Sequence, residues 1–273
     1  INLNNALGYL QDYSTGIYDA ASGGIMNVNT NAVGIELTLI GNSERIFNQS
    51  ILKVGTINVN GDSNAGGAYS KAINMALGSF PTVTIEISDG TINLRSNSLG
   101  IITNTIDQET INNSAAINIT GGNSYGFISY GGGYPFSLAQ IKNSGDISVN
   151  VSGSTLLSAG IYHQIITSFT NTGNISVNST GINSSGLAGI LLDPEAVFTN
   201  DGTGGKKISA SGAKATGVFA NGNTTNTIKN TKIEASSGGI GIFSYNGSDV
   251  KLDNITGEAS SGGVLFYAAD TPT

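Results

Sequence analysis

The segment FTNTGNISV, residues 169–177, carries the pattern that decides the fold of this chain. It reads as an apolar residue, any residue, asparagine, a short turn, and then isoleucine, any residue and a second apolar residue. Another copy, IKNSGDISV at residues 141–149, begins 28 residues earlier. A repeat of that length indicates a chain built by stacking similar units along an axis. It favours an elongated surface protein over an enzyme with a single cleft.

The asparagine phrase alternates along the chain with a second phrase, in which glycine precedes the start of an apolar segment. Successive glycines of this kind, such as Gly160 and Gly189, lie 18 to 34 residues apart. The sequence EASSGG also occurs twice, at residues 234–239 and 258–263, with a period of 24. An identical match at the period of the other phrases indicates true internal repetition.

Each unit has room for three short β-strands separated by turns. In the unit that starts at Gly160 we expect them near residues 161–162, 168–170 and 175–177. No 3.6-residue apolar period persists, which argues against helical repeats. A propeller blade needs four strands in roughly 40–50 residues, and the left-handed hexapeptide helix needs a strict six-residue period. The sequence therefore predicts an all-β, right-handed parallel β-helix (β-solenoid) of about nine or ten coils.

The recurring asparagine has a physical reason at a corner between two strands. Asparagine accepts left-handed backbone geometry more readily than most residues. Stacked on its equivalent in the next coil, its amide can donate and accept hydrogen bonds along the axis. We therefore expect a structural ladder in one line, formed by Asp89, Asn113, Asn143, Asn171, Asn200, Asn230 and Asn254. By the same reasoning Ile175 and Val177 face inward and Ser176 faces water.

Two segments depart from this pattern. Residues 1–15 are expected to form an N-terminal cap or an incomplete first coil, and residues 16–273 the β-helix, cut from a longer chain. Leu3, Ala6, Leu7 and Leu10 have helical spacing, so a short capping helix is expected over residues 4–13. Ala72, Ile73, Ala76 and Leu77 share that spacing, which predicts either a short helix on the rod or an insertion beside the core.

Composition narrows the class of protein. Charged residues make up 11% of the 273 residues and the net charge is −7, which argues against a nucleic-acid partner. No apolar run approaches the about 18 residues of a membrane helix, so no membrane contact is expected. Cysteine is absent and histidine occurs once, so neither disulfides nor a metal site are expected, and no cofactor is implied. β-Branched residues at alternate positions, as in residues 56–60, argue against disorder.

A hydrolase site has little support. Gly61-Asp62-Ser63 is a fragment of a serine-hydrolase signature, and the alternative is a turn after a strand. The chemistry needs a histidine, and His163 is the only one, with no acid beside it in the sequence. We expect His163 to be a surface residue of a strand and the chain not to be an enzyme.

A glycan-cleaving site would need clustered carboxylates on one face of the rod. The densest acidic set is Asp89, Asp107 and Glu109, with Arg95 as the only base nearby. Asp89 is better explained as a substitute for asparagine in the ladder.

One aromatic segment interrupts the repeat at residues 125–136. Here Tyr130, Tyr134 and Phe136 accompany a run of glycines. They could form an aromatic platform that binds a glycan or protein ligand. The alternative is a row of rings that stack on neighbouring coils.

These phrases resemble the extracellular passenger regions of Gram-negative type V autotransporters, and most of all their large Asn-rich adhesins. The resemblance covers residues 16–267 and rests on phrases such as residues 171–177 followed by Gly189-Ile190, on low charge and on the lack of cysteine. It implies a cell-surface or secreted location and a C-terminal β-barrel translocator in the full-length protein. It also implies adhesion to host-cell proteins or glycans, matrix or other bacteria, and a role in virulence.

One other protein family and two other functions are also compatible with this fold. Filamentous-haemagglutinin-type exoproteins carry an Asn-Pro-Asn-Gly-Ile secretion motif, which is absent here. A carbohydrate-active β-helix, lyase, hydrolase or tailspike-like, is the functional alternative to adhesion. An inert spacer is the other.

Overall fold

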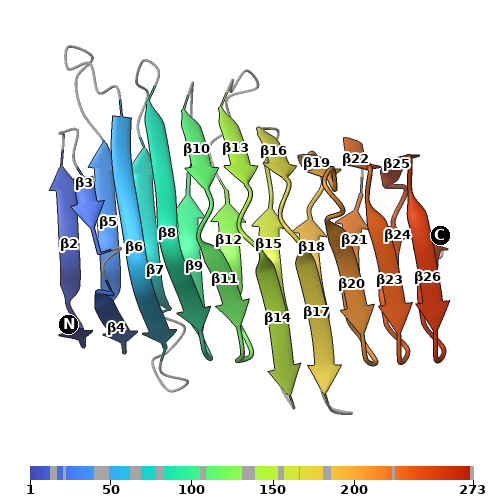
Figure 1. Cartoon of the computed structure of the whole chain (residues 1–273), viewed down its shortest axis with the longest axis horizontal. Coiled ribbons are helices and arrows are strands. Elements are labelled where there is room, and N and C mark those ends of the chain that lie inside the picture. The colour runs from blue at the N-terminus through green and yellow to red at the C-terminus, as the bar shows by residue number, and fades with distance from the viewer. Residues whose placement is uncertain are drawn as a thin grey trace.

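The computed structural model describes residues 1–12, 17–20, 23–39, 49–61, 69–77, 83–104, 109–130, 139–152, 157–165, 167–180, 186–222 and 225–270. Within these ranges every regular element is a β-strand. Figure 1 shows the strands side by side along the long axis of the molecule, from the N-terminal end to the C-terminal end. Each ladder pairing is parallel and joins one coil to the next.

One coil contains three strands, as in β16 (Ser168–Asn171), β17 (Ile175–Thr180) and β18 (Leu187–Leu192). The other first strands are β3 (Ile17–Asp19), β10 (Thr110–Asn113), β13 (Gln140–Asn143), β19 (Val197–Asp201), β22 (Thr225–Lys229) and β25 (Asp249–Asp253). The other second strands are β1 (Asn2–Leu3), β4 (Ile25–Asn29), β11 (Ala116–Ile119), β14 (Ile147–Ser152), β20 (Lys207–Ser211), β23 (Lys232–Ser236) and β26 (Thr256–Ser260).

The third strands form a separate ten-stranded sheet, with one strand from each coil. Its other members are β2 (Leu7–Asp12), β5 (Val33–Leu39), β7 (Ser70–Leu77), β9 (Ser98–Thr103), β12 (Tyr125–Ser129), β15 (Ser158–His163), β21 (Ala215–Asn221), β24 (Ile240–Tyr245) and β27 (Val264–Ala269). The first and second strands belong to one 17-stranded sheet, because β6 (Gln49–Asn60) and β8 (Thr84–Leu94) each continue as one strand around the corner between them.

The predicted parallel β-helix is therefore confirmed. Among the described residues, seven coils have three separate strands, two have the merged strands β6 and β8, and β1 and β2 begin an incomplete coil. The right-handed sense of the coil stays a prediction, and it agrees with the usual hand of parallel crossovers.

The core is built from equivalent residues stacked in register. Ile147, Ile175 and Ile208 lie opposite one another in successive second strands, and all are buried. Phe169 and Phe198 stack in the first strands with ring centroids 5.6 Å apart. The inward orientation predicted for the Ile-x-Val phrase is confirmed, because its serines face outward between buried isoleucine and valine. Each coil therefore buries its apolar residues against its two neighbours.

A row of inward glycines lies under these isoleucines. A Cβ atom built on Gly189 would come within 2.4 Å of the Cγ2 atom of Ile175 and 2.7 Å of the Gly217 carbonyl oxygen. Gly160 and Gly217 are enclosed in the same way by the isoleucine of their own coil and the next glycine of the row. The phrase in which glycine precedes an apolar strand thus marks a position with no room for a side chain.

The short capping helix expected over residues 4–13 is wrong, and so is the helix that was one of the two alternatives for the segment around Ala72 and Ile73. Residues 7–12 form β2, which pairs with β5, and residues 70–77 form β7, which pairs with β5 and β9. Ala72 and Ile73 are fully buried in β7. In both segments the parallel ladder supplies backbone hydrogen bonds and apolar neighbours, which outweigh a local helical spacing. Among the described residues, no helix is long and apolar enough to span a membrane.

Candidate functional site

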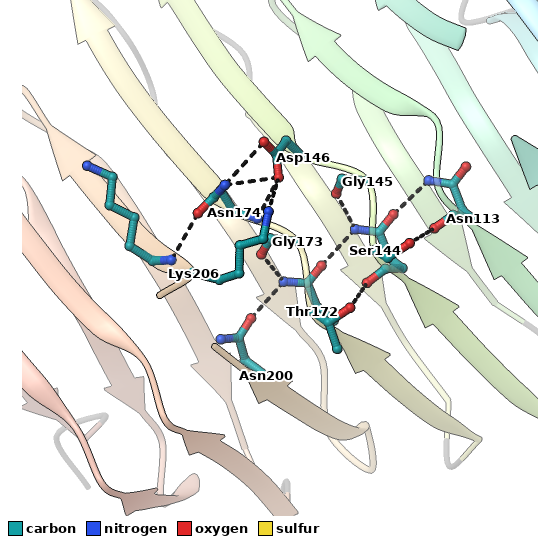
Figure 2. Close-up of polar contacts among 12 residues, drawn as sticks. Asn113, Ser144, Gly145, Asp146, Thr172, Gly173, Asn174, Asn200 and Lys206 are labelled. Carbon is teal, nitrogen blue, oxygen red and sulfur yellow. Dashed lines mark hydrogen bonds and ion pairs between the residues drawn. The ribbon is translucent and has the colours of Figure 1, made fainter. Parts of the chain in front are cut away.

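Four of the predicted ladder residues form one buried row. Asn113 donates from Nδ2 to Oδ1 of Asn143 at 2.6 Å, and Asn143 and Asn171 continue to the next residue at 2.7 Å each. Asn200 closes the row by donating to the Thr231 hydroxyl at 2.9 Å. Figure 2 shows this line of amides running across successive coils.

The same amides also hold the corners. Nδ2 of Asn143 donates to the Gly145 carbonyl oxygen at 2.8 Å, and Nδ2 of Asn171 donates to the Gly173 carbonyl oxygen at 2.9 Å. In the corner of the preceding coil, Asn113 accepts a hydrogen bond from the backbone N–H of Ala115. The row therefore satisfies backbone groups that the short turn would otherwise bury unpaired.

The other three predicted members of the ladder lie outside this buried row, on the surface of the rod. Asp89, Asn230 and Asn254 are exposed and have φ values of 55°, 51° and 50°, which is left-handed geometry. Asn254 donates to Asn230 at 2.9 Å, and Asn230 donates to Asp201 at 3.1 Å. The two properties predicted for a single row, inward hydrogen bonding and left-handed geometry, therefore belong to two different rows. The buried residues form the inward ladder and the exposed residues turn the chain.

Corners of five residues carry the exposed group, whereas Asn113, Asn143 and Asn171 begin corners of four residues and Asn200 begins one of eight. Asn171 lies four residues before the buried Ile175, whereas Ile228 lies five residues before the equivalent Ile233. The strand register sets Ile228, not Asn230, opposite Asn200. In the five-residue corner an apolar side chain fills the inward position, and the asparagine two residues later makes the turn.

The aromatic platform expected in residues 125–136 is only partly within the described residues. Tyr134 and Phe136 lie outside them. Tyr130 directly follows β12, and 44% of its surface is exposed. Its binding role stays a prediction.

A groove of about 500 Å³ lies on the outer face of the ten-stranded sheet, across β18, β21 and β24. Among its lining side chains only Lys214 and Thr216 are polar. The apolar part of the lining comprises Leu157, Leu187, Ala188, Leu191, Phe219, Ile240 and Phe243. A concave apolar surface of this kind is typical of a binding site for an apolar group.

Aromatic rings extend the groove towards the C-terminal end. Phe219, Phe243 and Tyr267 occupy equivalent positions in β21, β24 and β27. Their neighbouring ring centroids are 5.0 Å and 5.1 Å apart, and Tyr267 is 50% exposed. We name the groove and these three rings the apolar face.

The apolar face was not predicted from the sequence, although one signal for it is present there. Residues 187–192 read LAGILL, with apolar residues on both sides of the strand instead of on one. Such a run indicates a strand covered on both faces. Here the inner side faces the core, and Ala188 and Leu191 face outward in a separate apolar cluster.

The prediction that His163 is a surface residue is wrong, because it is completely buried at the end of β15. Its Nε2 lies 2.9 Å from the Thr167 carbonyl oxygen, which can only accept, so Nε2 carries the proton. Its Nδ1 then accepts a hydrogen bond from the Ser129 hydroxyl. Burial lowers the His163 pKa to about 4, and hydrogen bonds with the backbone of Thr167 and Val197 oppose that shift only partly.

We expect the protein to lose stability as the pH falls from about 6.5 to about 4. The folded state holds His163 neutral with a pKa near 4, whereas the unfolded value is 6.5, so only the unfolded chain binds a proton in this window. The loss should approach about 3 kcal/mol when complete. Urea unfolding of the protein and of His163→Gln, at pH 7 and pH 5, measures it. Equal pH dependence in both would contradict the assignment. Carboxylates with a lowered pKa, such as Asp146 and Glu234, lose their contribution only as the pH falls towards and below their ordinary values of 3.8 and 4.5, so they change little between pH 7 and pH 5.

Of the acidic residues considered for catalysis, the two within the described ranges lie in different places. Glu109 is buried just before β10, whereas Asp89 is exposed at the corner within β8. Asp107, and Asp62 and Ser63 of the hydrolase fragment, lie outside the described residues. Within the described ranges no three histidine, cysteine, aspartate or glutamate side chains are grouped as a metal site requires.

Comparison of the chain with protein-family models, curated proteins and solved structures gave no match.

Proposed function

We propose that this chain is an adhesive segment of a passenger region that a bacterium secretes or displays on its surface, as in type V autotransporters. The apolar face carries the proposal. It is a concave apolar surface on a rod whose other two strand rows are dominated outside by asparagine, serine, threonine and charged residues. A concave apolar surface with a few polar groups at its margin is the usual form of a binding site.

The proposed partner is a protein on a host cell, in the extracellular matrix or on another bacterium. An aliphatic or aromatic side chain of the partner would enter the groove between Leu157 and Phe243, and the exposed Tyr267 would extend the contact. Burying such an anchor contributes roughly 1.5–3 kcal/mol per side chain, which is the scale of a binding hot spot. Lys214 at the rim of the groove adds a charge that favours an acidic residue beside the anchor.

The test is a binding assay with the whole chain. Beads coated with it should attach to cultured epithelial cells, to immobilised matrix proteins or to bacteria that display the same chain. The double variant Leu157→Ser/Phe243→Ser should weaken attachment at least 10-fold, because it removes two apolar walls of the groove.

Val197→Ser is the matched control, because Val197 is an apolar side chain that is 38% exposed on another strand row. It should leave attachment unchanged. Circular dichroism establishes that each variant is folded. Failure of the unmodified chain to attach to any of the three surfaces would favour the inert spacer, and equal attachment of the double variant would place the adhesive site elsewhere.

A further inference from the structure

A second row of amides lies on the outside of the rod, on the second strands of the N-terminal half. Asn27 donates from Nδ2 to Asn2 at 2.7 Å, and Asn58 donates to Asn27 at 2.9 Å. Asn93 and Asn118 continue the row with bonds of 2.9 Å and 3.0 Å. These residues are opposite one another in register and alternate with buried core residues.

The row forms one side of a polar groove of about 480 Å³. Two residues further along the strands, Asn29 and Asn60 are again opposite each other. Arg95 and Thr120 follow in the next two coils, just after β8 and β11. The lining comprises Asn2, Asn27, Asn29, Asn58, Val59, Asn60, Asn93, Arg95 and Thr120.

The amides of the row keep unused hydrogen-bonding capacity. An asparagine side chain has two N–H donors and two acceptor lone pairs. Along the row Asn58 uses one donor towards Asn27 and one lone pair for Asn93. The hydrogen bonds hold each amide in a fixed orientation, so a ligand meets donors and acceptors that have already lost their rotational freedom. The asparagine side chains of the groove recur about every 4.8 Å from one coil to the next along the axis, and about every 6.6 Å along each strand.

The charge of the lining defines the chemistry of a suitable ligand. It contains no carboxylate, and Arg95 is its only cation. A surface of fixed amides suits groups that donate and accept at the same atom, which is the property of a hydroxyl. A regular grid along the axis suits a ligand that repeats in one direction. Many hydroxyl groups and a repeat in one direction are both properties of a polysaccharide chain without charged sugars.

The same outer row changes character beyond this groove. Ser148, Ser176 and Ser209 follow Asn118 in register, and Glu234 and Glu258 follow them. Lys232 lies 2.7 Å from Glu234 and 2.9 Å from Glu258, so the carboxylates there are engaged in ion pairs. The amide row is therefore a local feature of the N-terminal coils and not a general requirement of the second strands.

We propose that this groove binds a neutral polysaccharide, with its chain lying along the axis across the amides of Asn27, Asn58 and Asn93. Arg95 donates further hydrogen bonds from the groove's other side, and the Thr120 hydroxyl, which itself donates to the Leu94 carbonyl oxygen, accepts one. The site lies on a different strand row from the apolar face and does not depend on the proposed function.

Affinity electrophoresis of the whole chain tests the proposal. Native gels contain one polysaccharide each: soluble starch, mixed-linkage β-glucan, galactomannan or, as a charged comparison, polygalacturonate. At least one neutral polymer should retard the chain, and 0.5 M salt should not abolish the retardation. Asn58→Val/Asn93→Val should weaken it at least 10-fold, since valine favours a strand but offers no hydrogen bond.

Ser148→Val/Ser176→Val changes the same outer row outside the groove and should migrate like the unmodified chain. Leu157→Ser/Phe243→Ser should also keep full retardation, which separates this site from the apolar face. Three results would overturn the proposal: no retardation by any neutral polymer, salt-sensitive retardation by polygalacturonate alone, or unchanged retardation of the asparagine variant.

Discussion

Asn171→Leu should lower the free energy of unfolding by about 3–5 kcal/mol and the melting temperature by about 10 °C. The substitution removes the hydrogen bonds from Asn143 to Asn171 and from Asn171 to Asn200, together with the bond to the Gly173 carbonyl oxygen. Asn143 and Asn200 are almost fully buried, so their orphaned amide groups cannot turn to water. Each unsatisfied group costs about 1–3 kcal/mol. Urea and thermal unfolding measure the change.

Asn230→Gly is the matched control for the ladder. Asn230 is exposed and has a left-handed backbone that glycine adopts without strain. Its replacement should change the free energy of unfolding by less than about 1 kcal/mol. If both variants lost the same stability, the distinction between an inward ladder and an exposed turn row would fail.

Gly189→Ala should destabilise the protein by about 2–4 kcal/mol, although it adds only one methyl group. The new Cβ atom would lie 2.4 Å from Cγ2 of Ile175 and 2.7 Å from the carbonyl oxygen of Gly217. The oxygen is held by the neighbouring coil, and the methyl group lies in the packed core, so the strand itself must shift. The loss should appear in the urea midpoint.

Gly204→Ala controls for the backbone freedom of glycine. Gly204 has a φ of 86° and nothing within 4 Å of an added Cβ atom, so alanine there meets only backbone strain. That strain costs about 1 kcal/mol. A Gly189 variant no less stable than the Gly204 variant would show that the core has room at the glycine row.

The architecture could be predicted because its determinants are local and repeated. The phrase at residues 169–177 places a first strand, a corner and a second strand within nine residues. The same phrase recurs at residues 141–149, and the two segments pair in register throughout their strands. A pattern that recurs in coil after coil is far less ambiguous than a single amphipathic segment.

The ladder could be predicted only in part, because the amino-acid sequence alone does not give the register of the side chains around a corner. Asn171 and Asn230 stand in similar phrases, yet one faces the core and the other faces water. The difference is one residue in the length of the corner, and in a strand one residue reverses the side on which a side chain lies. Similarly, residues 70–77 have a helical spacing that the parallel neighbours of β7 override.

The apolar face and the outer amide row could not be predicted from the sequence for another reason. Each is assembled from residues that lie one coil apart in the sequence, and neither has a phrase of its own. Leu191 and Phe219 become neighbours only through the pairing of β18 with β21, and Asn58 meets Asn93 only through that of β6 with β8. His163 was misplaced because the strand was expected to end at residue 162, whereas β15 continues to His163, and alternation sets His163 on the same inward side as Ile161.

The parallel pairing of coils also determines how the rod responds to force. Its strands lie across the long axis, so the backbone hydrogen bonds between coils run mainly along that axis (Figure 1). A pull between the two ends strains these bonds in the direction in which they part. Because a coil rests only on its neighbours, the end coil is released first and the others follow in turn. A coil as long as the interval from Gly189 to Gly217, 28 residues, extends to roughly 90 Å when released. A rod of this kind yields stepwise, and each released coil replaces about 4.8 Å of rod with roughly 90 Å of extended chain.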